Sequence, residues 1–318
     1  MSMIYSNNSI KSEFKAYLVK EFAIAKQKTN KDFVLNIVQI GDNLASSKYV
    51  GIKKKIGLQL GVIVNHHHFE DGIEQQKLVD LYNHASDNNQ GFIFQLPLPP
   101  QYSHLVPLTP LSTDVDLLSN SAFLLWSKGF LPPTIGAIDL IYKEMQLRSD
   151  NNLIEVENVF GISIETVAMQ DLVNNDDTVV ASSKINFEKL VTQKADYTGK
   201  VVAVIGQGIL VGTPLVKYLL DRNATVISVN KDTQNPKSLT TQADIIFSGA
   251  GVAGLVNKDW IKKDAIVIDA ATSGVGGEIF GDVNKDDIDQ STYLCPSPKG
   301  VGPLTVLYIF WNLLKILD

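Results

Sequence analysis

Short apolar runs of strand character alternate along this chain with segments of helical periodicity. The first set of strand-like runs covers residues 33–40, 61–65 and 91–95, with helical patterns over 45–60 and through Leu78 and Leu81. A second set covers residues 201–206, 225–229, 243–249 and 265–270, with a helix over 212–221. Such alternation requires right-handed crossovers and gives a largely parallel sheet. We therefore predict an α/β fold whose functional edges lie at the carboxyl ends of the strands.

Composition and charge narrow the class of protein. The 318 residues suffice for about two domains, and 45% hydrophobic with 19% charged residues is typical of a globular fold. The net charge of −6 argues against a nucleic-acid partner. Because the only cysteine, Cys295, cannot form an intrachain disulfide, we expect a reducing, cytoplasmic location.

Neither end of the sequence suggests a membrane protein. The N-terminal residues lack the basic patch and apolar core of a signal peptide. The longest apolar run, Leu304–Leu317, is shorter than the roughly 20 residues that span a bilayer. We predict that it is a buried helix with Pro303 at its first position, and that no membrane is a partner.

The segment VVAVIGQGILVG places Gly206, Gly208 and Gly212 between a strand and a helix. Glycines here permit a tight turn and a close backbone approach to a pyrophosphate, although a plain strand-to-helix turn could also use them. A second strand about 20 residues further on favours a Rossmann-type nucleotide site. After that strand, Asn230 and Lys231 favour NADP, while the nearby Asp232 leaves NAD possible.

A polar stripe marks the helix predicted over 45–60. Ser46, Tyr49 and Lys53 lie on one helical face, and we expect the apolar stripe of Ile52, Ile56 and Leu60 beside it to anchor the helix. The alternative is a solvated run of lysines, Lys53 to Lys55. A partly buried lysine would be suited to proton transfer, because burial lowers its pKa.

Three further segments could contribute polar groups to the same cleft. Gln95 ends a strand before a rigid LPLPP exit, although it could be an ordinary loop residue. Asp114 and Asp116 follow, and turn formation would explain either equally well. The stretch from Cys295 to Val306, rich in Gly and Pro, could line a ligand with backbone N–H groups or be a plain connection.

The run His66 to His68 lies at a predicted strand end. Consecutive strand residues point to opposite faces, so these three cannot share one metal ion. We predict no metal site and a structural or surface role for the histidines.

Taken in order, VQIGDNLASSKYVGIKKK, GFIFQLPLPP, TDVD, LPPTIG, VVAVIGQGILVGTPLVKYLL, ADIIFSGAG, GDV and GVGPLTV resemble the bifunctional methylenetetrahydrofolate dehydrogenase/methenyltetrahydrofolate cyclohydrolase family. The resemblance implies a folate-binding catalytic domain over residues 1–130, completed by 303–318, and a Rossmann-type domain over 131–302 with an insertion near 149–194. It also implies a homodimer that acts on tetrahydrofolate derivatives. Oxidation of 5,10-methylenetetrahydrofolate with NADP⁺ would precede hydrolysis of the methenyl product to 10-formyltetrahydrofolate.

Carried over by position, the resemblance implies specific roles. Lys53 would be the catalytic lysine, tuned by Gln95 and supported by Ser46, while Tyr49 would stack on the folate. The implied binding residues are Asp116 for the pterin, Gly300, Val301, Gly302 and Pro303 for the folate and nicotinamide, and Gly206, Gln207, Gly208 and Thr272 for the cofactor.

The sequence departs from the family pattern mainly near the cofactor. G-Q-G replaces G-[RA]-S, N-K replaces H-S after the second strand, and D-V-D-L replaces D-V-D-G. Two rival functions therefore stay open: a non-catalytic relative that binds nucleotide or folate, and an NADP-dependent oxidoreductase of another small substrate.

Overall fold

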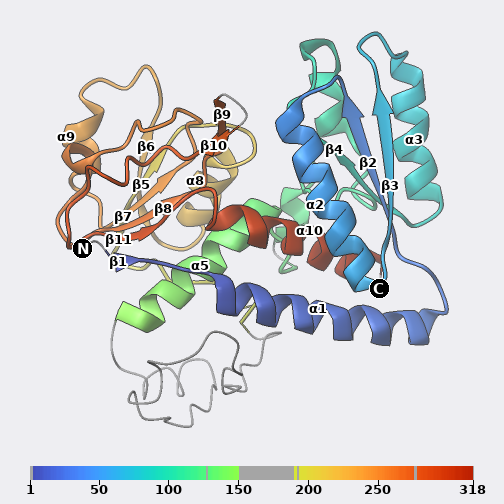
Figure 1. Cartoon of the computed structure of the whole chain (residues 1–318), viewed down its shortest axis with the longest axis horizontal. Coiled ribbons are helices and arrows are strands. Elements are labelled where there is room, and N and C mark those ends of the chain that lie inside the picture. Colours follow the sequence, from blue (N-terminus) through green and yellow to red (C-terminus); the bar gives the residue numbers. More distant parts are fainter. Residues whose placement is uncertain (1–2, 127, 150–189, 192, 276–277, 318) are drawn as a thin grey trace.

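The structure is a computed structural model that describes residues 3–126, 128–149, 190–191, 193–275 and 278–317. Figure 1 shows two α/β lobes, each built on its own sheet, with long helices running between and beneath them. The predicted α/β class with two units is confirmed.

The smaller lobe carries a parallel three-stranded sheet in the order β3-β2-β4. Its elements are β2 (Val34–Ile40), α2 (Leu44–Leu60), β3 (Ile63–Phe69), α3 (Gln75–Asp87) and β4 (Gly91–Phe94). The central strand β2 is buried at every position but its first, as expected for a strand flanked on both sides. Because β3 runs on to Phe69, the three histidines lie within the strand rather than at its end.

The larger lobe carries a parallel six-stranded sheet in the order β1-β11-β8-β7-β5-β6. Its elements are β1 (Met3–Ile4), β5 (Val201–Ile205), α8 (Gly212–Leu220), β6 (Thr225–Val229), β7 (Ile245–Ser248), β8 (Ile266–Asp269) and β11 (Tyr293–Cys295). The chain goes from β5 to β6 on one side and then returns to β7 on the other side. The strand order therefore reverses at β5 and β7, where open α/β sheets bind their ligands.

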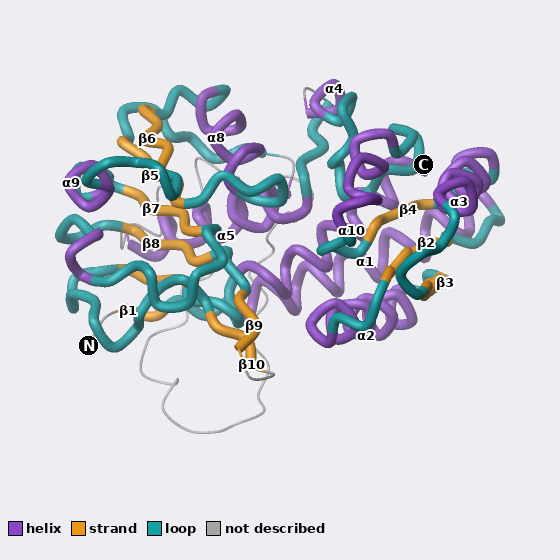
Figure 2. Tube along the Cα trace, turned by 90° about the horizontal axis from the view of Figure 1, so that it is seen from above, coloured by secondary structure: helices purple, strands orange, loops and turns teal. Residues whose placement is uncertain are grey.

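Three long helices connect the lobes: α1 (Asn8–Thr29), α5 (Pro133–Ser149) and α10 (Val301–Leu317). The last helix, α10, packs against α5, α1, α2 and β4, so the C-terminus returns to the N-terminal lobe as predicted (Figure 1). It begins at Val301, which makes Pro303 its third residue rather than its first. Figure 2 shows the same arrangement from above, with the two sheets well separated.

The remaining elements are short: η1 (Pro100–Leu108), α4 (Phe123–Trp126), α9 (Pro236–Thr240), η3 (Lys258–Trp260), and the antiparallel pair β9 (Ser273–Val275) and β10 (Glu278–Phe280). None of the described helices is long and apolar enough to cross a membrane.

The predicted insertion near 149–194 falls mostly on residues 150–189, which lie outside the described residues. Its last part is different, because Leu190 and Val191 are buried in the main core. The Nζ of Lys143 donates to the carbonyl oxygens of Leu190, at 2.6 Å, and Gln193, at 2.5 Å. Leu190, Val191 and Gln193 are therefore integral to the fold.

Candidate active site

Helix α2 carries two polar side chains, Ser46 and Lys53, on its buried face. The side chain of Asn43 caps the helix by accepting from the backbone N–H of Ser46, at 3.0 Å. Ser46, Val50, Lys53, Gly57 and Leu60 make up its buried face. A Cβ atom on Gly57 would lie 2.3 Å from Cγ2 of Val64, so the glycine allows the helix to pack closely.

The expected anchoring stripe was partly wrong. Ile52 is 46% exposed, whereas Leu60 is buried and Ile56 packs against the core as expected, and Val50 and Gly57 complete the buried face. The physical reason is the close approach at Gly57, which rotates the polar stripe into the core. Ser46 and Lys53 are consequently buried, while Tyr49 is half-buried.

The Lys53 ammonium is held by a single side-chain amide. Its Nζ donates to Oε1 of Gln95 at 2.8 Å. The Nε2 of Gln95 donates to the carbonyl oxygen of Leu96, which fixes the amide with its oxygen toward the lysine. Burial lowers the pKa of Lys53, and the negative charge of Asp116 opposes that shift. This lysine can therefore exchange a proton more readily than an exposed one.

Ser46 reaches the same strand exit as Gln95. Its Oγ donates to the Leu96 carbonyl oxygen at 3.2 Å, so it contacts the segment that holds Gln95. The structure thus brings Ser46, Lys53 and Gln95 together at the end of β4.

The two aspartates of the TDVD segment differ in surroundings. Asp114 is buried and accepts from the backbone N–H of Ser119 at 2.7 Å, and burial raises its pKa to about 6. Turn formation is therefore the correct interpretation of Asp114. Asp116 lies close enough to Lys53 for their charges to interact; burial raises the pKa of Asp116 and the lysine opposes the rise.

Tyr49 brings the two lobes together. Its phenol lies near the side chain of Thr272, which follows β8 in the larger lobe, closely enough for that side chain to lower the Tyr49 pKa. A Cβ atom on Gly302 would lie 3.8 Å from the same phenol oxygen, so the start of α10 also reaches this point. Burial is the larger influence and raises the pKa of Tyr49, while the nearby Thr272 side chain opposes the rise.

The segment before α10 is tightly packed. A Cβ atom on Gly300 would lie 2.4 Å from Sγ of Cys295, and Val301 is buried in the core. Gly302 and Pro303 are only half-buried. Of these two residues, Gly302 lies beside the phenol oxygen of Tyr49.

The three glycines of the loop after β5 serve different purposes. Gly206 has φ +89°, and a Cβ atom there would lie 2.6 Å from Cα of Ala250. A Cβ atom on Gly212 would lie 1.8 Å from the Gly206 carbonyl oxygen, so this glycine lets α8 approach the strand. Gly208 has nothing within 4 Å of its Cβ position. A tight turn, an open glycine and a helix N-terminus together fit a dinucleotide pyrophosphate.

The side chains of Gln207 and Asn230 near this loop form hydrogen bonds within their own turns. The Nε2 of Gln207 donates to the Val204 carbonyl oxygen at 3.2 Å, so its side chain turns back toward the strand. After β6, the side chain of Asn230 accepts from the backbone N–H of Asp232 at 2.9 Å and closes a turn. Lys231 is exposed on that turn.

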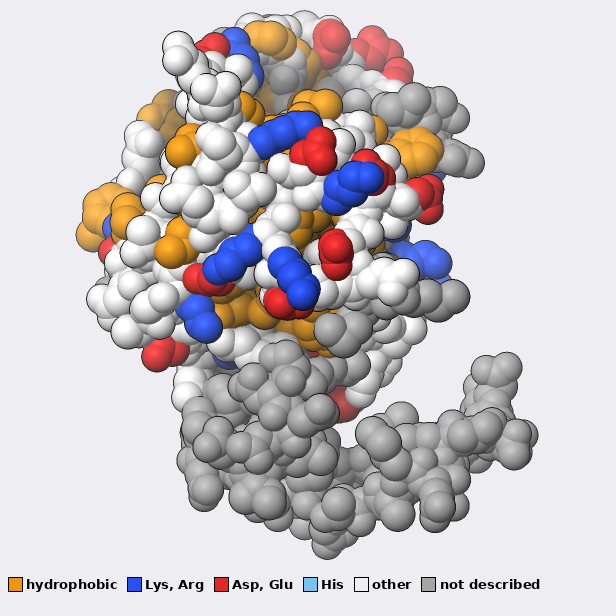
Figure 3. Space-filling model, turned by 90° about the vertical axis from the view of Figure 1, so that its left-hand side faces the viewer, with side chains coloured by type: hydrophobic (Ala, Val, Ile, Leu, Met, Phe, Trp, Pro, Cys, Tyr) orange, Lys and Arg blue, Asp and Glu red, His pale blue; other side chains and the backbone are white. Residues whose placement is uncertain are grey.

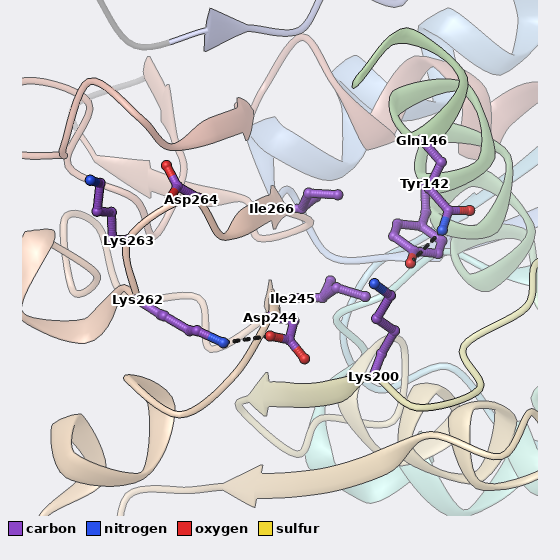
Figure 4. Close-up of a pocket in the computed structure, with 9 residues that line it drawn as sticks. All are labelled: Tyr142, Gln146, Lys200, Asp244, Ile245, Lys262, Lys263, Asp264 and Ile266. Atoms are coloured by element: carbon purple, nitrogen blue, oxygen red, sulfur yellow. Dashed lines mark hydrogen bonds and ion pairs between the residues drawn. The ribbon is translucent and has the colours of Figure 1, made fainter. Parts of the chain in front are cut away.

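A cavity of about 400 Å³ lies at the other end of the larger sheet (Figure 4). Lys200, Asp244 and Ile266 line it, and they sit at the amino ends of β5, β7 and β8. The Nζ of Lys262 pairs with Oδ1 of Asp244 at 2.6 Å. Open parallel sheets bind ligands at their carboxyl edge, so this cavity is not the nucleotide site.

Each of the three histidines of β3 lies within hydrogen-bonding distance of a polar group of the same lobe. The rings of His66 and His68 stack with centroids 5.7 Å apart, and Nε2 of His66 lies 3.2 Å from Oε1 of Gln39. Within the described part of the chain, no group of three or more His, Cys, Asp or Glu side chains could hold a metal ion.

Comparison with known proteins decides the family. The family model of the tetrahydrofolate dehydrogenase/cyclohydrolase catalytic domain matches residues 6–116, and that of its NAD(P)-binding domain matches residues 181–318. The chain belongs to the tetrahydrofolate dehydrogenase/cyclohydrolase family.

Individual relatives agree with this family over their full length. The bifunctional protein FolD of Malacoplasma penetrans is 32% identical, with 97% of this chain and 94% of the relative covered. The crystal structure of the bifunctional enzyme FolD from Campylobacter jejuni is 25% identical with a TM-score of 0.77, and covers 100% of this chain and 99% of its own. The Trypanosoma brucei enzyme, solved with NADP and an inhibitor, shares the fold at 23% identity and a TM-score of 0.76, with 99% and 97% covered.

Sequence reasoning gave no role to two buried carboxylates beside the nucleotide edge, Asp269 and Asp282. Burial raises the pKa of Asp269 to about 6. Asp282 belongs to the GDV segment. The position of that segment after the strand predicted over 265–270 was the only feature of the sequence that pointed to a role for Asp282.

Proposed function

We propose that this chain oxidises 5,10-methylenetetrahydrofolate with NADP⁺ and hydrolyses the methenyl product to 10-formyltetrahydrofolate, with Lys53 as the proton carrier. The buried Lys53–Gln95 pair, with Asp116 opposite and Tyr49 in contact with the other lobe, is the observation that supports the assignment. The family to which the chain belongs carries both activities in its description.

Hydrolysis of the methenyl group requires protons to move at two places. Water adds to the carbon between the two nitrogens and must lose a proton, and one carbon–nitrogen bond then breaks as its nitrogen gains a proton. The Lys53 amine can accept the first proton and return it to the leaving nitrogen. A lysine whose pKa is lowered by burial has the neutral form available for this task.

The neighbours of Lys53 keep it in place between the two steps. Gln95 accepts from the Lys53 Nζ in a fixed direction, because its own Nε2 is bound to Leu96. The carboxylate of Asp116 would bind a polar edge of the pterin and also limit how far the lysine pKa falls.

Bound NADP⁺ supplies the hydride acceptor for the oxidation. Gly206 and Gly208 would hold its pyrophosphate at the start of α8, Gln207 would supply backbone groups, and Lys231 would face the 2′-phosphate. On the folate side, Tyr49 would stack on the substrate, while Thr272 and the backbone of 300–303 would line the space between substrate and cofactor.

The domain organisation that we propose keeps the boundaries expected from the sequence. Residues 1–130 with 303–318 form the folate-binding domain, and residues 131–302 form the nucleotide-binding domain. Packing of α10 against α1, α2 and β4 supports the first grouping. One qualification is that β1 pairs in parallel with β11, so the first strand joins the sheet of the larger lobe.

We also propose a cytoplasmic homodimer that does not bind nucleic acid. The net charge of −6 supports the last point. On the face shown in Figure 3, Lys and Arg side chains are interspersed with Asp and Glu, so that face carries no single-sign field. Light scattering on the purified chain tests the dimer, which a mass near 34.9 kDa would contradict.

The direct test of the proposed function is an assay of the purified chain with 5,10-methylenetetrahydrofolate and NADP⁺. We expect reduction of NADP⁺ and subsequent conversion of added methenyltetrahydrofolate to the formyl product above its spontaneous rate. Nucleotide binding without either reaction would instead favour a non-catalytic relative.

A further inference from the structure

The loop after β7, residues 249–252, lies at the carboxyl edge of the larger sheet, where the strand order reverses. Ser248, the last residue of β7, pairs with Ile205 of β5 on one side and with Asp269 of β8 on the other. The contact of Gly206 with Ala250 shows that the loops after β5 and β7 touch at this edge. Val252 is 52% exposed, so its side chain is available to a bound nucleotide.

Most of this loop lacks the hydrogen bonds of regular structure. Gly251 has φ +72°, and the backbone N–H groups of Ala250 and Val252 point away from the strands. They are held instead by one side chain, the fully buried carboxylate of Asp282. Oδ2 of Asp282 accepts from Ala250 N at 2.7 Å and Ser248 Oγ at 2.6 Å, and Oδ1 accepts from Val252 N at 2.7 Å.

We propose that Asp282 is a positioning residue that holds the loop 249–252 in the shape that binds NADP⁺. The inference rests on the proposed function, because it takes the carboxyl edge of β5 and β7 as the nucleotide site. Asp282 has no exposed surface and therefore acts through the loop rather than on the cofactor.

The chemistry of the site requires a carboxylate and not an amide. Asp282 accepts with both oxygens, whereas asparagine has a single oxygen and an NH₂ group that can only donate. Whichever way an asparagine is turned, the backbone N–H of either Ala250 or Val252 loses its acceptor. A buried donor left without a partner is costly, so the loop should leave this conformation.

The experiment compares Asp282→Asn with Asp244→Asn. Asp244 also accepts a backbone N–H, from Val201 at 3.0 Å, but lies at the opposite end of the sheet. We expect Asp282→Asn to raise the Kd for NADP⁺ by calorimetry on the order of tenfold, corresponding to the loss of one such hydrogen bond. Hydrogen exchange in peptides covering 248–254 should accelerate, while cyclohydrolase turnover should change less than about twofold, because hydrolysis uses no nucleotide.

Asp244→Asn is expected to leave NADP⁺ affinity and exchange in 248–254 unchanged. If Asp282→Asn does not fold, Ser248→Ala removes one donor to the same carboxylate and should raise the Kd by a smaller factor, roughly two- to fivefold.

Unchanged NADP⁺ affinity in the Asp282 variant, or in Ser248→Ala where that one is used, would overturn the inference, as would an equal fall of both activities. Failure of the unmodified chain to bind NADP⁺ would overturn the proposed cofactor, and this inference with it.

Discussion

At the residue scale, the environment of a side chain decides its role more than its type does. Asp114 and Asp116 are two residues apart, yet one closes a turn and the other faces Lys53. Leu117, where the resembling family has glycine, has φ +54° and is buried at 3% exposure. A left-handed non-glycine residue costs about 1–2 kcal/mol, which burial of the leucine side chain offsets.

Asp114→Asn should stabilise the protein increasingly as the pH rises. Burial raises the folded-state pKa of Asp114 from 3.8 to about 6, so its ionisation destabilises the fold as the pH rises through that window. Asparagine retains an oxygen for Ser119 and does not ionise. The gain in unfolding free energy over the unmodified protein should grow by up to about 3 kcal/mol between pH 4 and pH 7.

Denaturant unfolding of both proteins at the two pH values measures this gain. A stability difference that does not vary with pH would show that Asp114 is already ionised in the folded state throughout.

Lys231→Ala should remove most of the preference for NADP⁺ over NAD⁺. A charge-assisted contact to the 2′-phosphate contributes roughly 1.5–3 kcal/mol, on the order of ten- to a hundredfold in affinity. We expect kcat/KM to fall by about tenfold with NADP⁺ and hardly at all with NAD⁺. Lys237→Ala is the control, because Lys237 pairs with Asp259 at 2.9 Å on the same lobe.

Equal or better efficiency of the unmodified protein with NAD⁺ would contradict the assignment. It would point to Asp232 as the residue that faces the ribose.

At the scale of elements, local periodicity was sufficient to predict the boundaries of those strands and helices that are long and keep one hydrophobic period throughout. The strand at 225–229 and the helix over 45–60 were predicted to within a residue or so. The strands β1, β11, β9 and β10 were missed because they have only two or three residues, too few for a periodic pattern. In addition, β1 and β11 exist through pairing with partners distant in the sequence. The buried face of α2 was misjudged at Ile52 because Gly57 sets the rotation, a packing effect that periodicity does not report.

Replacing residues 150–189 with a short Gly/Ser linker should leave a folded protein with cyclohydrolase turnover within a few-fold of the unmodified chain. A replacement that extends through Lys194 should fail to fold, because it removes buried Leu190 and Val191 and two acceptors of Lys143. Lys143 is 1% exposed and would keep only its ion pair with Asp139 at 2.9 Å.

Circular dichroism and thermal unfolding of the two replacements distinguish these outcomes. If both replacements fold equally well, or if the shorter one fails to fold, the boundary between the insertion and the core lies elsewhere.

At the scale of the whole molecule, the active site that we propose lies where three distant parts of the chain meet. Tyr49 from α2, Thr272 after β8 and Gly302 at the start of α10 come together between the lobes. The order of motifs predicted the two-domain plan and the returning helix, and Lys53 and Gln95 were predicted as partners. The role of Asp282 could not be predicted, because its hydrogen bonds depend on how the loop after β7 folds over it.

Lys53→Met removes the amine that we propose as the proton carrier in hydrolysis. A thioether fills similar space but transfers no proton, so we expect cyclohydrolase turnover to fall by at least about a hundredfold. Far-ultraviolet circular dichroism and NADP⁺ affinity should remain those of the unmodified protein, since Lys53 lies in the other lobe from Gly206. Cyclohydrolase turnover within a few-fold of the unmodified enzyme would show that Lys53 is not the proton carrier.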